Sequence, residues 1–245
     1  MNFQIVTIFP SLIKDMLSYG IIGKALKSNL IKVNTLNPRD FSDEDNQRID
    51  DKPYGGGPGM VMQAQPLIKA ISYAQQQHDS SFVVYMSPRG SNFNQNKAKE
   101  FSKKKNLIIV CGRYEGIDQR VLDNKVDEEC SVGDFVVTGG EIPALLVTEA
   151  VSRFIPGVVG DSQSVDDDSF SQGLLEYPQF TRPEKDESGE VPQVLLSGDH
   201  KKISKWRLKQ SILKTYKNRP DLLNSRDMTE EEKIWLKEII NEEGK

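Results

Sequence analysis

The segment "NLIIVCGRYEG", residues 106–116, joins a continuous apolar run to a loop bounded by glycines. Two other segments repeat this pattern, "FVVYMSPRG" at residues 82–90 and "SVGDFVVTGGE" at residues 131–141. Short apolar runs that end at glycine are typical of buried β-strands. Helical stretches, such as "NQNKAKEFSKKK" and "IPALLVTEAVSRFI", separate or follow these runs. The alternation predicts an α/β fold with a mainly parallel sheet.

Such a sheet would place the three glycine-bearing loops side by side, because ligands of parallel sheets bind beyond the carboxyl ends of the strands. In "CGRYEG", the backbone amides of Gly112 and Gly116 could face a ligand, and Glu115 could meet a cation. A carboxylate at a strand end is also often only a helix cap. Because "TGGE" repeats the arrangement on the next strand, a small-molecule pocket is favoured.

Composition narrows the class of protein. The chain has 245 residues, of which 37% are hydrophobic, enough for one large domain or two modest ones. Residues 1–17 read as a buried strand followed by a helix, since they lack the basic leader and cleavage site of a signal peptide. The sequence contains no run of eighteen or more apolar residues, so no membrane-spanning helix is predicted. We therefore expect a cytoplasmic protein with no membrane association.

The chain contains few histidine and cysteine residues that could act in catalysis or bind a metal. The chain has two cysteines, Cys111 and Cys130, and two histidines, His78 and His200. They are too few and too scattered for a zinc site or a disulfide framework, so no metal ligands are predicted. Cys111 ends an apolar run and is expected to be a small buried hydrophobe.

The composition changes at about Gly160, where serine, glutamine and aspartate replace apolar residues. We expect residues 1–160 to form the α/β domain and residues 173–245 a smaller, mostly helical one. The polar composition of the segment between them, residues 161–172, predicts a flexible linker. A solvated connection would account for most such segments.

A basic helix is expected in the second domain, although the net charge of the chain is −4. Residues 201–220 contain eight lysines or arginines and no acid. Apolar residues recur among them at helical spacing, which predicts an amphipathic helix with a cationic polar face. This face suits a phosphate backbone, and an ordinary solvated face is the alternative. The glycine-rich segment "KPYGGGPGM", residues 52–60, lacks the spacing of a nucleotide loop and predicts a mobile turn or a close approach to a large partner.

Seven motifs occur together and in order: "YGGGPGM", "SPRG", "LIIVCGRYEGIDQRV", "SVGDFVVTGGE", "SRFIPGVVG", "DSF.QGLLEYP.FTRP" and "VLLSGDH..I..WR". From Phe3 to about Leu223, the chain resembles the bacterial tRNA (guanine-N1)-methyltransferases of the SPOUT superfamily. The resemblance implies a deep trefoil knot in the α/β domain, which sequence patterns cannot reveal because knots are so rare. It also implies a homodimer whose active sites are shared between subunits, and transfer of a methyl group from S-adenosylmethionine to N1 of guanosine-37, next to the tRNA anticodon.

Two catalytic residues follow from the resemblance. N1 of guanine is protonated at neutral pH, so a general base must remove the proton, and a carboxylate is the natural candidate where histidine is scarce. By match to the "DSF" motif this base is Asp168, and its neighbours Asp166 and Asp167 are not excluded from helping. Arg153 would stabilise the negative charge that develops on O6. A linker that becomes ordered only when tRNA docks would couple the chemistry to substrate recognition.

The resemblance also implies a cofactor site on the three loops, where Glu115 would pair with the amino group of S-adenosylmethionine. Leu146 is left out because it reads as helix core. Phe135 and Gln179 stand where family members often have tyrosine and histidine, which puts any hydroxyl or imidazole contact there in doubt. The predicted cofactor-binding residues are Tyr85, Pro88, Gly90, Gly112, Tyr114, Glu115, Val132, Gly133, Phe135, Gly139, Gly140 and Pro143.

Several alternatives stay open at this point. The carboxylates of Glu115, Asp168 and Glu176 would permit Mg²⁺, although no ligand spacing requires it. Arg182, in "FTRP", is expected to help to position the anticodon loop. A non-catalytic RNA-binding factor on the same scaffold, or a SPOUT enzyme that methylates a ribose hydroxyl, would share much of this pattern.

Overall fold

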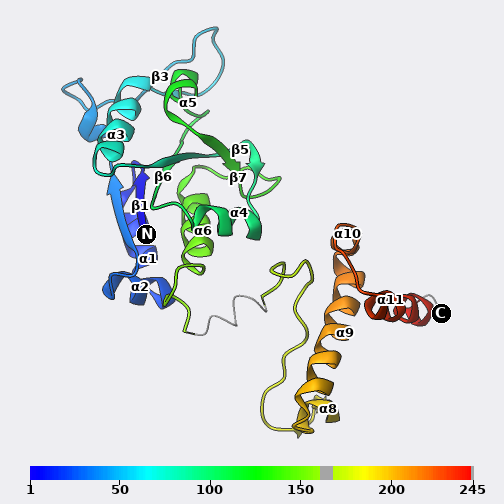
Figure 1. Ribbon diagram of the computed structural model, residues 1–245. Coiled ribbons are helices and arrows are strands. Elements are labelled where there is room, and N and C mark those ends of the chain that lie inside the picture. The colour runs from blue at the N-terminus through cyan, green and yellow to red at the C-terminus, as the bar shows by residue number, and fades with distance from the viewer. Residues whose placement is uncertain (161–167, 244–245) are drawn as a thin grey trace. The chain divides into compact units, whose positions relative to one another are not determined.

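The computed structural model describes residues 1–160 and 168–243 (Figure 1). The chain divides into two compact units, Met1–Ser162 and Gln163–Lys245, which we call the sheet unit and the helical unit. The boundary falls within the predicted linker, and residues 161–167 of that linker lie outside the described residues. Its remaining residues, 168–172, form turns.

The sheet unit is built on a parallel sheet, as predicted. Among the described residues, five strands pair in the order β2-β1-β6-β5-β7, and every pair is parallel. The central strand is β6, in which all six residues are buried. A strand covered on both faces needs a continuous apolar run, which explains "LIIVC". The strands are β1 (Asn2–Val6), β2 (Lys32–Leu36), β5 (Phe82–Asn92), β6 (Asn106–Cys111) and β7 (Glu128–Ser131).

Helices cover both faces of this sheet, and Figure 1 shows α3 and α5 on one side and α1, α2, α4 and α6 on the other. Side chains alternate between the faces along β6: Leu107 and Ile109 pack in one core, Ile108 and Val110 in the other. The helices are α1 (Pro10–Leu17), α2 (Gly20–Lys27), α3 (Ala64–Gln76), α4 (Gln95–Phe101), α5 (Gln119–Lys125) and α6 (Glu141–Ser152). The 3-10 helix η1 (Pro38–Phe41) and the short pair β3 (Asp50–Asp51) and β4 (Val61–Met62) complete the unit, and β3 and β4 flank the glycine-rich segment 52–60.

The predicted position of the third strand is wrong. Residues 131–141 were expected to form it, but β7 ends at Ser131 and residues 132–140 form a loop. Phe135, Val136 and Val137 in this loop are exposed, with Val136 at 85%. Their apolar run resembles a buried strand in composition, yet it lies outside the core.

The helical unit has a small core of its own around Leu174, Ile212, Trp235 and Ile239. Its longest helix, α9, begins after Asp199, whose carboxylate accepts hydrogen bonds from the backbone N–H groups of residues 201 and 202. The elements are β8 (Lys185–Asp186), β9 (Gly189–Glu190), α8 (Gln193–Leu196), α9 (His200–Asn218), α10 (Pro220–Asn224) and α11 (Glu230–Glu243). In the described parts of both units, we find no helix that is long and apolar enough to cross a membrane.

Replacing Gly90 by alanine should destabilise the sheet unit. Gly90 lies where the register of β5 against β7 shifts, and a Cβ there would be 2.3 Å from the backbone nitrogen of Cys130. We expect Gly90→Ala to lower the free energy of unfolding by more than about 2 kcal/mol in a denaturant titration. Gly160→Ala, where a Cβ would meet nothing within 4 Å, is the matched control and should stay within about 0.5 kcal/mol of the parent. Equal stability of the two variants would contradict the close approach of β5 to β7.

Candidate functional site

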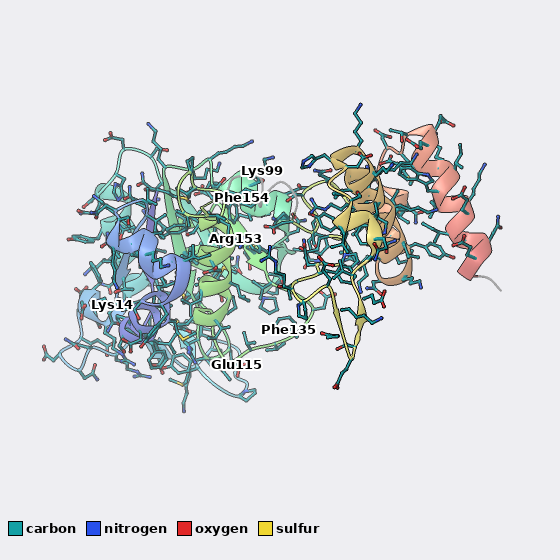
Figure 2. The ribbon with its side chains drawn as sticks, turned by 90° about the horizontal axis from the view of Figure 1, so that it is seen from below. Lys14, Lys99, Glu115, Phe135, Arg153 and Phe154 are labelled. Atoms are coloured by element: carbon teal, nitrogen blue, oxygen red, sulfur yellow. The ribbon has the colours of Figure 1, made fainter. Side chains whose placement is uncertain are left out.

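A cavity of about 360 Å³ opens beyond the carboxyl ends of β5, β6 and β7. Eleven of the twelve residues predicted to bind a cofactor line it, and Figure 2 labels two of these, Glu115 and Phe135. The eleven are Tyr85, Pro88, Gly112, Tyr114, Glu115, Val132, Gly133, Phe135, Gly139, Gly140 and Pro143. The three loops therefore come together as the sequence predicted.

Two residues differ from their predicted places. Gly90 is not part of the cavity lining that the described residues form, and its lack of a side chain instead allows β5 to approach β7. Leu146 was expected in the helix core, but it is 50% exposed on α6, as is Ile142 one turn earlier. The sequence of α6 does not reveal this exposed face, because α6 is strongly apolar and buried residues flank each exposed one.

Glycine allows the walls of the cavity to close on one another. A Cβ on Gly112 would lie 2.6 Å from the hydroxyl of Tyr85, and one on Gly140 would lie 2.7 Å from the Cα of Cys111. The N–H of Gly140 donates to the carbonyl of Gly112 at 3.0 Å. Tyr114 has a φ of +60°, a conformation that residues other than glycine rarely adopt. The loop after β7 is thus held against the end of β6.

A buried ion pair fixes the same two loops. Both Nε and a terminal nitrogen of Arg113 lie 2.9 Å from Oε2 of Glu141, whose side chain is 1% exposed. The hydroxyl of Thr7 donates to the other carboxylate oxygen at 2.8 Å. The Arg113 guanidinium also lies 4.6 Å from the centre of the Phe9 ring. Arg113, from the loop after β6, is thereby joined to the start of α6 and to the residues that follow β1.

Sequence analysis did not find this ion pair, although both charged residues lie within quoted motifs. A glutamate in the first turn of a helix ordinarily reads as a partner of the helix dipole. The glycine at position 139 is related to this ion pair, since a Cβ there would lie 2.2 Å from Nε of Arg113. This relation is visible only in the folded structure, because the sequence does not show that the two residues are neighbours.

The glycine-rich segment 52–60 lies against Glu115. The N–H of Glu115 donates to the carbonyl of Met60 at 3.0 Å, and a Cβ on Gly59 would lie 2.4 Å from a carboxylate oxygen of Glu115. Gly59 has a φ of +79°, which favours glycine. This segment supports the candidate cofactor loop.

The thiols and the phenol near the cavity are protonated at neutral pH. Burial raises the pKa of Cys130 to about 11 and that of Cys111 well above its usual value. Burial likewise raises the pKa of Tyr85. Neither cysteine therefore supplies a thiolate nucleophile, and Cys111 is buried as the sequence predicted.

The two predicted catalytic residues lie in different units. Asp168 belongs to the helical unit, whereas Arg153 directly follows α6 in the sheet unit (Figure 2). Pro143, at the cavity, and Arg153 are ten residues apart along this helix, which corresponds to about 15 Å along its axis. Arg153 is not among the described residues that line the cavity.

The basic helix is less cationic than its sequence suggests. Lys205 lies 2.5 Å from Glu231 and Lys209 lies 3.0 Å from Glu238, and both acids belong to α11. Lys202 pairs with Asp199, and Arg219 with Asp221. The helix itself carries no acid in residues 201–220, as the sequence shows, but part of its positive charge is paired with acids of α11 and with acids that flank its two ends.

The structure gives no support for Mg²⁺. Within residues 1–160 and 168–243, no three histidine, cysteine or acidic side chains gather closely enough to hold a metal ion. Of the carboxylates considered for this role, Glu115 lies in the sheet unit and Asp168 and Glu176 lie in the helical unit.

Comparison with known proteins gives a consistent result. Residues 1–225 match the family model described as tRNA (guanine-1)-methyltransferase TrmD. A tRNA (guanine-N(1)-)-methyltransferase of Buchnera aphidicola subsp. Schizaphis graminum is 52% identical over 237 residues, which cover 97% of this chain and 90% of that protein. The protein of the same name from Vibrio cholerae is 48% identical, with 97% of each chain covered. That from Marinomonas sp. is 45% identical, with 99% of this chain and 97% of its own covered.

Glu141→Gln should loosen the loops around the cavity. The variant keeps the size of the side chain but leaves the guanidinium of Arg113 without its buried charge partner. We expect the free energy of unfolding to fall by about 1–3 kcal/mol in a denaturant titration. Lys69→Gln breaks the exposed ion pair with Asp43 and should change stability by less than about 0.5 kcal/mol. If both variants unfold at the same denaturant concentration, the buried ion pair does not hold the loops.

Proposed function

The chain belongs to the tRNA (guanine-1)-methyltransferase family, and we propose that Asp168 and Arg153 are its catalytic residues. The protein is a tRNA (guanine-N1)-methyltransferase that depends on S-adenosylmethionine. Membership in this family decides against both a non-catalytic RNA-binding factor and an enzyme that methylates ribose. We further propose guanosine-37, next to the anticodon, as its target.

The observation that carries the cofactor proposal is the gathering of eleven predicted residues around one cavity. The residues fit the cofactor: Gly112 and Gly140 allow the walls to close around this space, and the exposed carboxylate of Glu115 suits an ammonium group. S-adenosylmethionine supplies an electrophilic methyl group when bound. Backbone amides of the three loops would orient its adenine edge, and Glu115 would hold its amino group.

Asp168 would accept the N1 proton of guanine. Removing this proton frees the lone pair that attacks the methyl group and leaves negative charge on O6. The guanidinium of Arg153 would stabilise that charge. Asp168 is half-buried on a turn of the helical unit, so its carboxylate can be reached by a base.

We also propose that the enzyme is a homodimer with shared active sites. Ile142, Leu146 and Arg153 follow one another at helical spacing on one side of α6. If a second copy packed on this side in antiparallel orientation about a two-fold axis, its Arg153 would lie near Ile142, beside the cavity. The exposed side chains of Phe9, Met16 and Tyr19 on and near α1 would add apolar area to the contact.

The trefoil knot implied by family membership also belongs to this proposal. The chain leaves β7 at one edge of the sheet and returns past β5 to the end of β6, where residues 139 and 140 meet residues 111–113. A chain that crosses its own path at this point is what such a knot requires.

For tRNA, we propose that exposed cations of α9, such as Lys201 and Lys214, contact phosphates. Lys205 and Lys209 are engaged by α11 and would contribute less. Arg182 would help to position the anticodon loop. A tRNA substrate implies that the enzyme acts in the cytoplasm.

Asp168→Asn tests the catalytic base. The amide cannot accept the N1 proton, so the rate of methyl transfer should fall by about 10²–10⁴, while the affinity for S-adenosylmethionine, measured by calorimetry, stays unchanged. The assay uses tRNA transcripts with guanosine or adenosine at position 37, and only guanosine should be methylated. Turnover of the asparagine variant at the parent's rate would contradict the role of Asp168.

A mixture of two inactive variants tests the shared site. Glu115→Lys should repel the amino group of the cofactor, and Arg153→Ala should remove the charge at O6. In a heterodimer, one site combines intact loops from one chain with intact Arg153 from the other, so co-expression should restore about a quarter of the parent's sites. No recovery in a purified, doubly tagged heterodimer would mean that Arg153 acts within its own chain.

A further inference from the structure

The helical unit contains a second cavity, of about 260 Å³, between residues 168–177 and α9. The polar residues that line it are Asp168, Gln172, Glu176, Tyr177, Ser204, Arg207 and Ser211, and leucine side chains lie beside them. All of these residues belong to one compact unit, so the helical unit forms the cavity by itself.

The wall opposite α9 is fixed to this helix. The N–H of Leu175 donates to the hydroxyl of Thr215, which is fully buried, at 2.9 Å. Leu174 packs in the core of the unit. Nε of Arg226 donates to the carbonyl of Gln172 at 3.1 Å. Because these contacts hold the wall in place, the cavity is a built feature of the unit.

Arg207 is the cation of this cavity. Its guanidinium carbon lies 4.7 Å from the centre of the Tyr177 ring, a stacking contact that limits the rotation of the side chain. Its Nε is buried and has no hydrogen-bond partner among the described residues. A buried donor without an acceptor costs free energy. Because Nε itself is shielded, a ligand in the cavity would accept hydrogen bonds from the terminal nitrogens of the guanidinium.

The charges around the cavity select the chemistry of that ligand. An anion would meet Arg207 but would be repelled by the carboxylates of Asp168 and Glu176. Guanine satisfies both signs: its N1–H and N2 amino group donate to carboxylates, while O6 and N7 accept from arginine. Adenine would present an amino group where the arginine needs an acceptor. A guanine base therefore fits the lining better than a phosphate or an adenine.

We propose that this cavity receives the target guanine, with Arg207 as a specificity-determining residue that donates to N7 and O6. The inference rests on the proposed function, because it places the N1 edge of the base towards Asp168. Arg207 would recognise the guanine on binding, whereas Arg153 would act on O6 as the charge develops.

A cycle that combines a protein variant with a base analogue tests this proposal. Parent enzyme and Arg207→Met are compared on tRNA with guanosine or 7-deazaguanosine at position 37, an analogue that lacks only the N7 acceptor. We expect the parent to lose about tenfold or more in kcat/KM on the analogue. Arg207→Met should lose at least as much on guanosine but little further on the analogue. Losses that multiply, or a parent that is indifferent to the analogue, would overturn the proposal.

Further variants separate recognition of the base from other roles. Arg207→Lys keeps the charge but not the planar fork of donors, so it should also lose its response to N7; if it keeps both rate and response, Arg207 only neutralises a phosphate and the proposal fails. Arg120→Met, which removes an exposed arginine of the sheet unit, is the matched control and should keep the tenfold response of the parent. Affinity for S-adenosylmethionine and thermal melting show that each variant is folded. Failure of the proposed base would instead show as full activity of Asp168→Asn, whatever the result of the Arg207 cycle.

Discussion

The buried ion pair between Arg113 and Glu141 is the interaction on which the cavity beyond β5, β6 and β7 depends. Strands β6 and β7 are not neighbours, since β5 lies between them, so the sheet alone does not bring their loops together. The carboxylate of Glu141 binds Arg113 with two contacts and accepts a hydrogen bond from Thr7 as well. Glu141 is buried and the Arg113 side chain is only 21% exposed, so this largely shielded pair ties the loop after β6 to the start of α6.

Helix α6 begins at this ion pair, and its two ends lie near residues that we propose for two different chemical roles. Its first turn, with Pro143, borders the cavity proposed for the cofactor, and its far end precedes the arginine proposed to act on the base. Pro143 and Arg153 lie about 15 Å apart along the helix axis. The sharing of sites that we propose for a symmetric pair of chains would unite the two roles without any movement of α6.

The sequence predicted the parallel sheet and the meeting of the loops well, because both follow from local patterns. Strand β6 is apolar throughout as it is covered on both faces, and glycines mark the places where backbones touch. Two of the errors share a physical cause, which is that composition does not distinguish a buried apolar residue from an exposed one. Val136 and Leu146 are apolar and exposed. Contacts between distant residues, such as Lys209 with Glu238 and Thr7 with Glu141, have no signature in a linear pattern.

The order of strands has a consequence for synthesis of the chain. β1 pairs with β6 from Asn2 against Asn106 onwards, so one side of the first strand lacks its neighbour until more than one hundred further residues have been translated. At about 5–20 residues per second, this interval lasts about 5–20 s. During that time an apolar strand edge of the nascent polypeptide lacks its native neighbour and is open to wrong pairing.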